Sequence, residues 1–410
     1  MEDLVYLGKY IKLQRERRNL NISQLAYKCN FSRSYLSQIE SGRVIPSEKL
    51  NNTIDAIFTC LNLNYQNYLE KGLCLQQDVD DLLHYIFYNL QEQRDALYSK
   101  MRNEEEDYKS YKAFPRYCLS KFVYNVSMNN QTDSELDYLM KSLLDNINIF
   151  EIKDRSICYT FVGIYYRQKS NCDKSESFLL ESLKFGEFKD ITGITYYQLS
   201  ITQSLKNSVA IALLNIQKSI LRFKCDGNFK RIIYSQAQEA IILGRCGELE
   251  RAEKVLKEIL NNYQLNENFK KTLLINLAQS NISLKKYEEA LHILDEINIV
   301  NDNVIFMRLY VYYELSNKKD FNEYYESNIN NIKTILFKQQ TKILHMKINN
   351  EKQNEEYLHL LLETHSNDNL KYDVDLRVFV LDELIEYYEE IGKYKLSNKY
   401  LKEKIKLYEA

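Results

Sequence analysis

The chain contains few of the residues that interrupt helices. Among its 410 residues are only 10 glycines and 2 prolines, whereas average usage is roughly 7% Gly and 5% Pro. So few breakers argue against a loop-rich protein and predict an all-α chain with short turns. Tryptophan is absent although there are 34 tyrosines, and we assign no function to that bias.

Long apolar runs are also missing. No uninterrupted stretch approaches the roughly 20 apolar residues that a helix needs to cross a bilayer. The start, Met1 to Asp3, lacks the basic and then apolar layout of a signal peptide. We therefore expect a cytoplasmic protein with no membrane partner.

The sequence offers little to bind a metal or a cofactor. Its five histidines show no HExxH spacing, and its eight cysteines form no CxxC pair. No Gly-rich phosphate loop or Ser-His-Asp arrangement can be placed. We expect no metal, no cofactor and no enzymatic activity, with the cysteines reduced and mostly in the core. Redox sensing by one of them is a weaker alternative.

Near the N-terminus, the sequence predicts two short helices joined by a tight turn. Ser23 is a candidate N-cap for a helix over 24–29, and Asn30 suits the left-handed turn that follows. Ser32 is a candidate N-cap for a second helix over 33–41, which Gly42 would end. A further helix over 47–58 would begin at Ser47.

The spacing of side chains divides the two helices into an inner and an outer face. Apolar residues at inward positions predict a small core, closed by a preceding helix: Leu7, Ile11, Leu25, Ala26, Leu36 and Ile39. Polar residues on the second helix would then face outward: Arg33, Ser34, Ser37 and Gln38. A polar helix presented in this way suits the DNA major groove.

These residues resemble the XRE-type, lambda-repressor-like helix-turn-helix family over about residues 4–70. The resemblance is carried by Gly8, Ile11, Arg15, the SQLA run at 23–26, the SRSYLSQIESG run at 32–42, and Pro46-Ser47. It implies that Arg33, Ser34, Ser37 and Gln38 approach base edges, whereas Ser32, Tyr35 and Arg43 contact phosphates. It also implies a structural pair between Arg15 and Glu40.

Charge agrees modestly with binding to double-stranded DNA. Residues 1–72 hold ten Lys and Arg against seven Asp and Glu, a net charge of +3, whereas the remainder has a net charge of −5. A single N-terminal segment (residues 1–72, called the head below) would bind DNA weakly. We therefore expect a homodimer on a two-fold-symmetric DNA site. The alternative is that the fold is kept for contact with a protein.

From about residue 75 the chain repeats itself. Ala252 and Ala290 open similar apolar patterns 38 residues apart, and Gly163 begins a weaker one. Fainter copies lie near Leu136, Ser175, Ala210, Tyr324, Leu358 and Ser397. This period resembles tetratricopeptide (TPR) repeats, which implies seven to nine helix pairs in a right-handed solenoid with a concave face. A generic helical bundle is the alternative.

A basic head followed by TPR-like repeats resembles the RRNPP group of regulators. The resemblance implies a head at 1–72, a connecting helical segment at 73–112, and a repeat domain at 113–410 for peptide binding and dimerisation. It also implies a cytoplasmic transcription regulator, in quorum sensing with sporulation or virulence control as candidate outputs, governed by a short signalling peptide on the concave face. The alternative is a regulator that binds or dephosphorylates a response-regulator partner through the solenoid.

Peptide contacts are then expected on inner helices, because Asn and Gln meet backbone donors and acceptors together. The candidates are Asn125, Arg167, Tyr197, Gln198, Asn276 and Asn281. We place Asn276 first, since it and Asn281 lie on the first helix of the clearest repeat.

Overall fold

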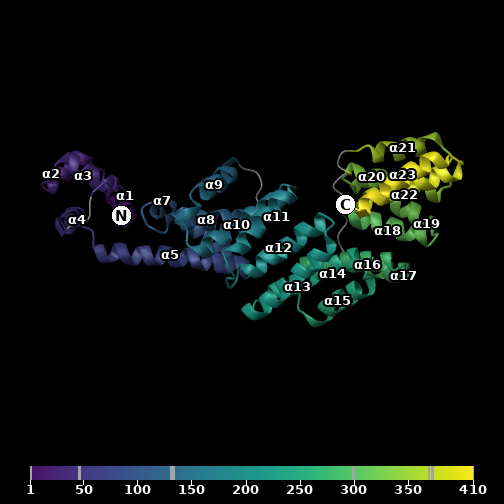
Figure 1. The fold of residues 1–410 in the computed structure, drawn as a ribbon, viewed down its shortest axis with the longest axis horizontal. Coiled ribbons are helices and arrows are strands. Elements are labelled where there is room, and N and C mark those ends of the chain that lie inside the picture. The colour runs from purple at the N-terminus through teal and green to yellow at the C-terminus, as the bar shows by residue number, and fades with distance from the viewer. Residues whose placement is uncertain are drawn as a thin grey trace. The chain divides into compact units, whose positions relative to one another are not determined.

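The structure is a computed structural model that describes residues 2–44, 48–129, 134–297, 301–367, 370 and 374–409. Within these ranges the regular elements are all helices, and no strand occurs. The all-α prediction is therefore confirmed (Figure 1).

The helices form two compact units. The first comprises residues 1–206 and 214–235, and the second comprises 207–213 and 236–410. The boundaries expected from the sequence, 72 and 112, remain predictions. Helix α5 (Tyr65–Phe87) runs without a break through residue 72.

The head is built from four helices around a small apolar core. They are α1 (Glu2–Arg17), α2 (Ile22–Lys28), α3 (Arg33–Glu40) and α4 (Glu48–Cys60). All six expected core side chains are buried: Leu7, Ile11, Leu25, Ala26, Leu36 and Ile39. Gly8 lets α1 approach α3 closely, because a Cβ there would lie 2.2 Å from the carbonyl oxygen of Ile39.

The ends of α2 and α3 show why the chain turns where it does. Ser32 caps α3, its Oγ accepting from the Tyr35 amide at 3.1 Å, and Asn30 (φ 56°) and Gly42 (φ 66°) adopt left-handed backbone as expected. The prediction of Ser23 as the cap of α2 is wrong. Asn21 takes that place, because its side chain and that of Gln24 satisfy each other's backbone amides. The expected features at Pro46 and Ser47 lie outside the described residues.

Two further helices, α6 (Gln91–Asn103) and α7 (Glu105–Tyr108), follow α5. Acidic side chains at 104–107 form ion pairs with distant basic residues. Glu104 pairs with Lys71 at 2.7 Å, and Asp107 pairs with Arg17 of the head at 2.6 Å. Each pair joins segments far apart in sequence.

The remainder of the first unit consists of helix pairs. They are α8 (Phe114–Ser127) with α9 (Ser134–Asp145), α10 (Ile152–Gln168) with α11 (Cys172–Lys184), and α12 (Thr192–Leu205) with most of α13 (Val209–Asp226). Helix α14 (Phe229–Arg245) begins in this unit. At Gly163, a Cβ would lie 2.6 Å from Leu179, so α10 and α11 pack more closely there than any larger residue allows.

The second unit continues the same pattern. Its helices are α15 (Leu249–Asn262), α16 (Glu267–Ser283), α17 (Tyr287–Asp295), α18 (Asp302–Glu314), α19 (Lys318–Asn328), α20 (Ile335–Ile348), α21 (Glu355–His365), α22 (Val374–Glu390) and α23 (Tyr394–Glu409). Ala252 and Ala290 are completely buried, as repeat positions require. Near Ala210, which is exposed, Ala212 is the buried small residue of α13.

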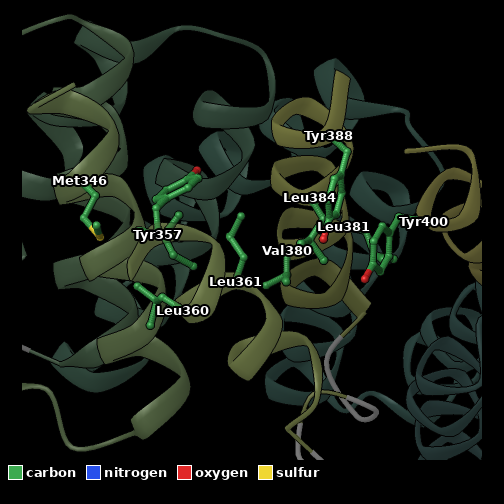
Figure 2. Close-up of a cluster of buried hydrophobic side chains, with 10 residues drawn as sticks. Met346, Tyr357, Leu360, Leu361, Val380, Leu381, Leu384, Tyr388 and Tyr400 are labelled. Atoms are coloured by element: carbon green, nitrogen blue, oxygen red, sulfur yellow. The ribbon is translucent and has the colours of Figure 1, made fainter. Parts of the chain in front are cut away.

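The C-terminal part of this unit has a dense apolar core. Figure 2 shows side chains from α20 to α23 converging, among them Tyr357, Leu361, Leu381 and Tyr400. The Tyr357 hydroxyl donates to Glu383 at 2.8 Å, so this buried polar group is satisfied. The tight packing of α20 to α23 stabilises the C-terminal end of the second unit.

No helix in the described ranges is long and apolar enough to cross a membrane. The same residues contain no cluster of His, Cys, Asp and Glu able to hold a metal ion. The expectation that most cysteines are core residues is wrong. Cys29 and Cys158 are buried, whereas Cys74, Cys225 and Cys246 are exposed.

Candidate nucleic-acid interface and inner-face cavity

Helix α3 presents a continuous polar surface. Arg33, Ser34, Ser37 and Gln38 are all exposed, and with Ser41 and Arg43 they line a hollow on the surface of the head. The opposite side of α3 is locked into the core by Leu36 and Ile39, which are 0% and 5% exposed. Packing on one side therefore fixes which side chains face solvent on the other.

The residues expected at phosphates flank this surface. Ser32 and Arg43 are exposed and Tyr35 is half-buried, at or beyond the two ends of α3. Phe31 packs edge-on against Tyr35, with ring centroids 5.9 Å apart, which limits the rotation of that ring. These positions suit groups that orient a helix on a phosphate backbone.

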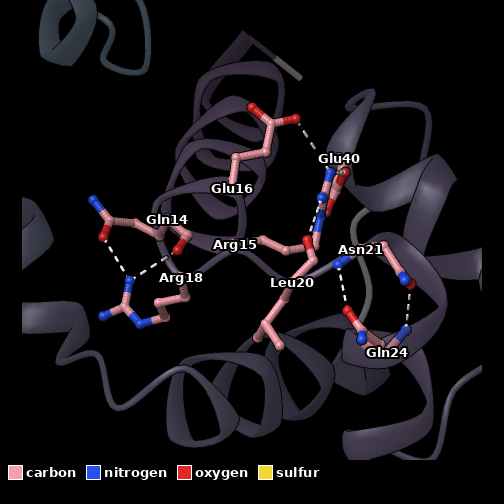
Figure 3. Close-up of polar contacts among 8 residues, drawn as sticks. All are labelled: Gln14, Arg15, Glu16, Arg18, Leu20, Asn21, Gln24 and Glu40. Atoms are coloured by element: carbon pink, nitrogen blue, oxygen red, sulfur yellow. Dashed lines mark hydrogen bonds and ion pairs between the residues drawn. The ribbon is translucent and has the colours of Figure 1, made fainter.

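Arg15 and Glu40 form a buried bidentate pair behind α3 (Figure 3). Arg15 Nε donates to Glu40 Oε1 at 2.7 Å, and Nη2 donates to Oε2 at 2.9 Å. Arg15 Nη1 also donates to the Leu20 carbonyl at 2.8 Å, which ties down the turn before α2. The hydrogen bonds that Arg15 donates to the Glu40 carboxylate raise the pKa of Arg15. The pair is placed to hold the frame of the head and does not face the exposed surface of α3.

A second candidate site lies in the repeats of the first unit. A cavity of about 280 Å³ is lined from α8, α10, α12 and α14, the first helices of successive pairs, together with the ends of α5 and α6. Three residues expected to contact a peptide share it: Arg167, Tyr197 and Gln198. Arg167 on α10 and Tyr197 and Gln198 on α12 reach the same cavity because consecutive helix pairs stack in similar registers.

Arginine dominates the electrostatics of this cavity. Arg94, Arg167 and Arg231 all line it, and no Asp or Glu is among its lining residues. Arg94 is neutralised by Asp95, at 2.8 Å and 3.0 Å. Arg231 donates to the carbonyls of Ile86 and Phe87 at the end of α5, each at 3.0 Å. Burial lowers the pKa of Arg167 and of Arg231.

Sequence reasoning missed Arg94 and Arg231. The repeat period could have identified Arg231. Residues at intervals of about one repeat line the cavity, namely Val126, Phe161, Ile194 and Arg231. Arg94 precedes the repeats, so no periodicity could have placed it.

The other expected peptide contacts lie elsewhere. Asn125 lines a separate cavity of about 360 Å³, and its amide donates to Tyr98 and to the Lys121 carbonyl. Asn276 and Asn281 belong to the second unit. Asn276 is half-buried, whereas Asn281 is completely buried, and no partner for its amide atoms is found in the described part of the chain. A ligand cannot reach Asn281 in this conformation, so Asn276 is the proposed contact on α16.

Comparison with known proteins places these features in context. Residues 7–56 match the family model described as "Helix-turn-helix domain". Curated proteins gave no match. The apo form of the quorum sensor NprR from B. thuringiensis is a similar solved structure, with a TM-score of 0.63 and 16% identity over 81% of this chain and 97% of that one.

Two further solved structures share the fold. NprR in complex with its cognate peptide NprX has a TM-score of 0.60 and 15% identity, covering 82% of this chain and 98% of that chain. A Rap protein complexed with competence and sporulation factor has a TM-score of 0.63 and 12% identity, covering 82% and 97%. The chain therefore joins an N-terminal helix-turn-helix domain to a helical fold that it shares with NprR and Rap.

Proposed function

We propose that this protein is a transcriptional regulator that reads double-stranded DNA through α3 and is controlled by a short signalling peptide bound at its helical repeats. The observation that carries the DNA-binding part is the exposed polar face of α3, held by a buried core and the Arg15–Glu40 pair. The helix-turn-helix match at residues 7–56 supports it. Arg33 is suited to guanine and Gln38 to adenine, with Ser34 and Ser37 beside them.

Fold similarity supports the peptide-binding part. NprR, whose solved complex contains the peptide NprX, shares the fold of the repeats. In this chain the inner helices also carry a polar cavity that includes three of the residues suited to a peptide. We propose that the peptide acts in a cytoplasmic homodimer, where two heads double the contacts of a modestly charged domain.

Selection of genomic fragments by the purified full-length protein tests the proposal. Wild type is compared with a double variant, Arg33→Ala with Gln38→Ala, and with Lys184→Gln, an exposed change on α11, as the control. A two-fold-symmetric motif recovered by wild type and by the control, but lost in the double variant, is the expected result. A motif equally enriched by all three proteins would contradict base reading by α3.

Rap similarity keeps one alternative in view, in which the repeats hold a protein partner and the head is secondary. Absence of any enriched motif, together with co-purification of a response regulator without DNA, would favour that alternative.

A further inference from the structure

We infer that the arginine-lined cavity of the first unit binds a carboxylate of the ligand, with Arg167 as the group that contacts it. This inference rests on the proposed peptide-regulated function and names the chemistry that the peptide must present. The carboxylate could be the C-terminus of the peptide or an acidic side chain, and the two sources are separable by experiment.

The three arginines of the cavity differ in how their charges are balanced. Arg94 has Asp95 as a bidentate partner. Arg231 lies against the C-terminal end of α5, whose last carbonyls carry partial negative charge and accept its hydrogen bonds. Arg167 has neither kind of partner. Its Nε is buried without a hydrogen bond, and no ion pair involving Arg167 is found among the described residues.

Arg167 as a whole is half-buried, and the burial of its Nε is costly because it removes water that no protein group replaces. The cavity contains no acidic side chain that could move to Arg167 by a rotamer change. The missing anion must therefore come from outside the chain. A carboxylate fits the planar fork of a guanidinium and can accept two parallel hydrogen bonds.

Gln198 indicates that the anion belongs to a peptide. Gln198 lines the same cavity as Arg167, is 9% exposed, and has an Oε1 atom for which the described residues provide no donor. A backbone N–H is the donor that a peptide supplies next to its carboxylate. Tyr197 borders the cavity from the same helix.

The size of the cavity favours the end of a peptide over its middle. Its volume of about 280 Å³ lies just below the roughly 300–1,000 Å³ that ligand pockets span. A chain terminus with one side chain fills such a space, whereas a central segment would bring more than one residue into it. Of the two sources, the C-terminal carboxylate is therefore the one we expect.

Two randomised hexapeptide mixtures serve as probes, one with free C-terminal carboxylates and one with C-terminal amides. Each mixture is passed over immobilised full-length protein, and retained peptides are identified by mass spectrometry. We expect retention from the free-acid mixture. Enrichment of Asp or Glu from the amidated mixture would support a carboxylate from a side chain instead.

The retained peptides are then titrated against Arg167→Gln, Arg167→Lys and Lys184→Gln. Arg167→Gln should raise Kd at least about 30-fold, because it removes one partner of a buried charge pair. Arg167→Lys keeps the charge but not the fork, so it should recover part of the affinity. Lys184→Gln removes one exposed positive charge outside the cavity and should leave Kd unchanged.

Binding that is equal for free-acid and amidated peptides without acidic residues would overturn the carboxylate assignment, and so would an unchanged Kd for Arg167→Gln. Either result leaves peptide binding itself intact. If wild type retains no peptide from either mixture, the proposed peptide-regulated function fails and the carboxylate site fails with it.

Discussion

The Arg15–Glu40 pair makes the stability of the head depend on one buried carboxylate. Both side chains are less than 10% exposed, and Glu40 accepts two hydrogen bonds from the Arg15 guanidinium. Glu40→Gln keeps the size of the side chain but removes its charge, which leaves Arg15 buried without a counter-ion. Removing one partner of a buried pair costs roughly 3–5 kcal/mol, a large share of the roughly 5–15 kcal/mol that holds a domain together.

Glu16 provides a matched control. Its carboxylate lies 3.5 Å from Arg15 Nη2, but its side chain is 52% exposed. Exposed pairs contribute about 0–1 kcal/mol, so Glu16→Gln removes the same charge near the same arginine at little cost. A third variant, Arg15→Met with Glu40→Leu, removes both charges and should recover most of the stability.

Amide hydrogen exchange is the appropriate assay, because it reports local opening and the chain has no tryptophan to follow by fluorescence. Exchange of peptides within residues 2–44 should accelerate by more than about 100-fold in Glu40→Gln, since each 1.4 kcal/mol is a factor of ten. Peptides from the second unit should not change. If Glu40→Gln lowered the free energy of opening by within about 1 kcal/mol of the change for Glu16→Gln, the reasoning would be refuted. The Arg15–Glu40 pair would then contribute no more than an exposed ion pair.

Three other predictions follow from single positions. Arg33→Ala should remove ~1–3 kcal/mol of discrimination between the selected motif and random DNA, as measured by competition binding; an equal loss on both DNAs would indicate a phosphate contact. Gly163→Ala should lower the free energy of unfolding by about 1–3 kcal/mol through overpacking, whereas Gly244→Ala on α14, with open space around its Cβ position, should be neutral or stabilising in the same thermal melts. Burial raises the pKa of Cys29 to about 12, so its thiol is protonated at pH 8 and should resist alkylation in the native protein, while exposed Cys74 reacts; equal rates in a mass-spectrometric time course would contradict the buried placement.

The fold of the head was predictable because its determinants are local. Periodicity identified the buried faces of α2 and α3, and Ser32, Asn30 and Gly42 marked their ends through capping and left-handed backbone. The cap of α2 was misassigned because Ser23 and Asn21 both have capping side chains. Only the reciprocal bonds with Gln24 distinguish them, and those depend on three-dimensional geometry.

The presence of repeated helices could be predicted from the sequence, but the register of individual helices was harder to predict. Ala252 and Ala290 sit in strongly patterned helices and are buried as expected. In α13, two alanines two residues apart compete for the close-packed position, and the sequence does not separate Ala210 from Ala212. The cavity was harder still, since Arg167 and Arg231 are distant in the chain and meet only when successive helix pairs stack.

Helix α5 gives the first unit a physical connection between its two candidate sites. Near its N-terminal end, Tyr68 stacks on Tyr111 at 4.8 Å and packs against Tyr10 of the head at 4.6 Å. At its C-terminal end, its last carbonyls accept the hydrogen bonds of Arg231 in the cavity. An anion that draws Arg231 toward itself competes with those carbonyls, because both seek the same N–H donors. A ligand in the cavity would therefore act on one end of a continuous helix whose other end is packed against the helix-turn-helix head, which gives the proposed ligand control a physical route.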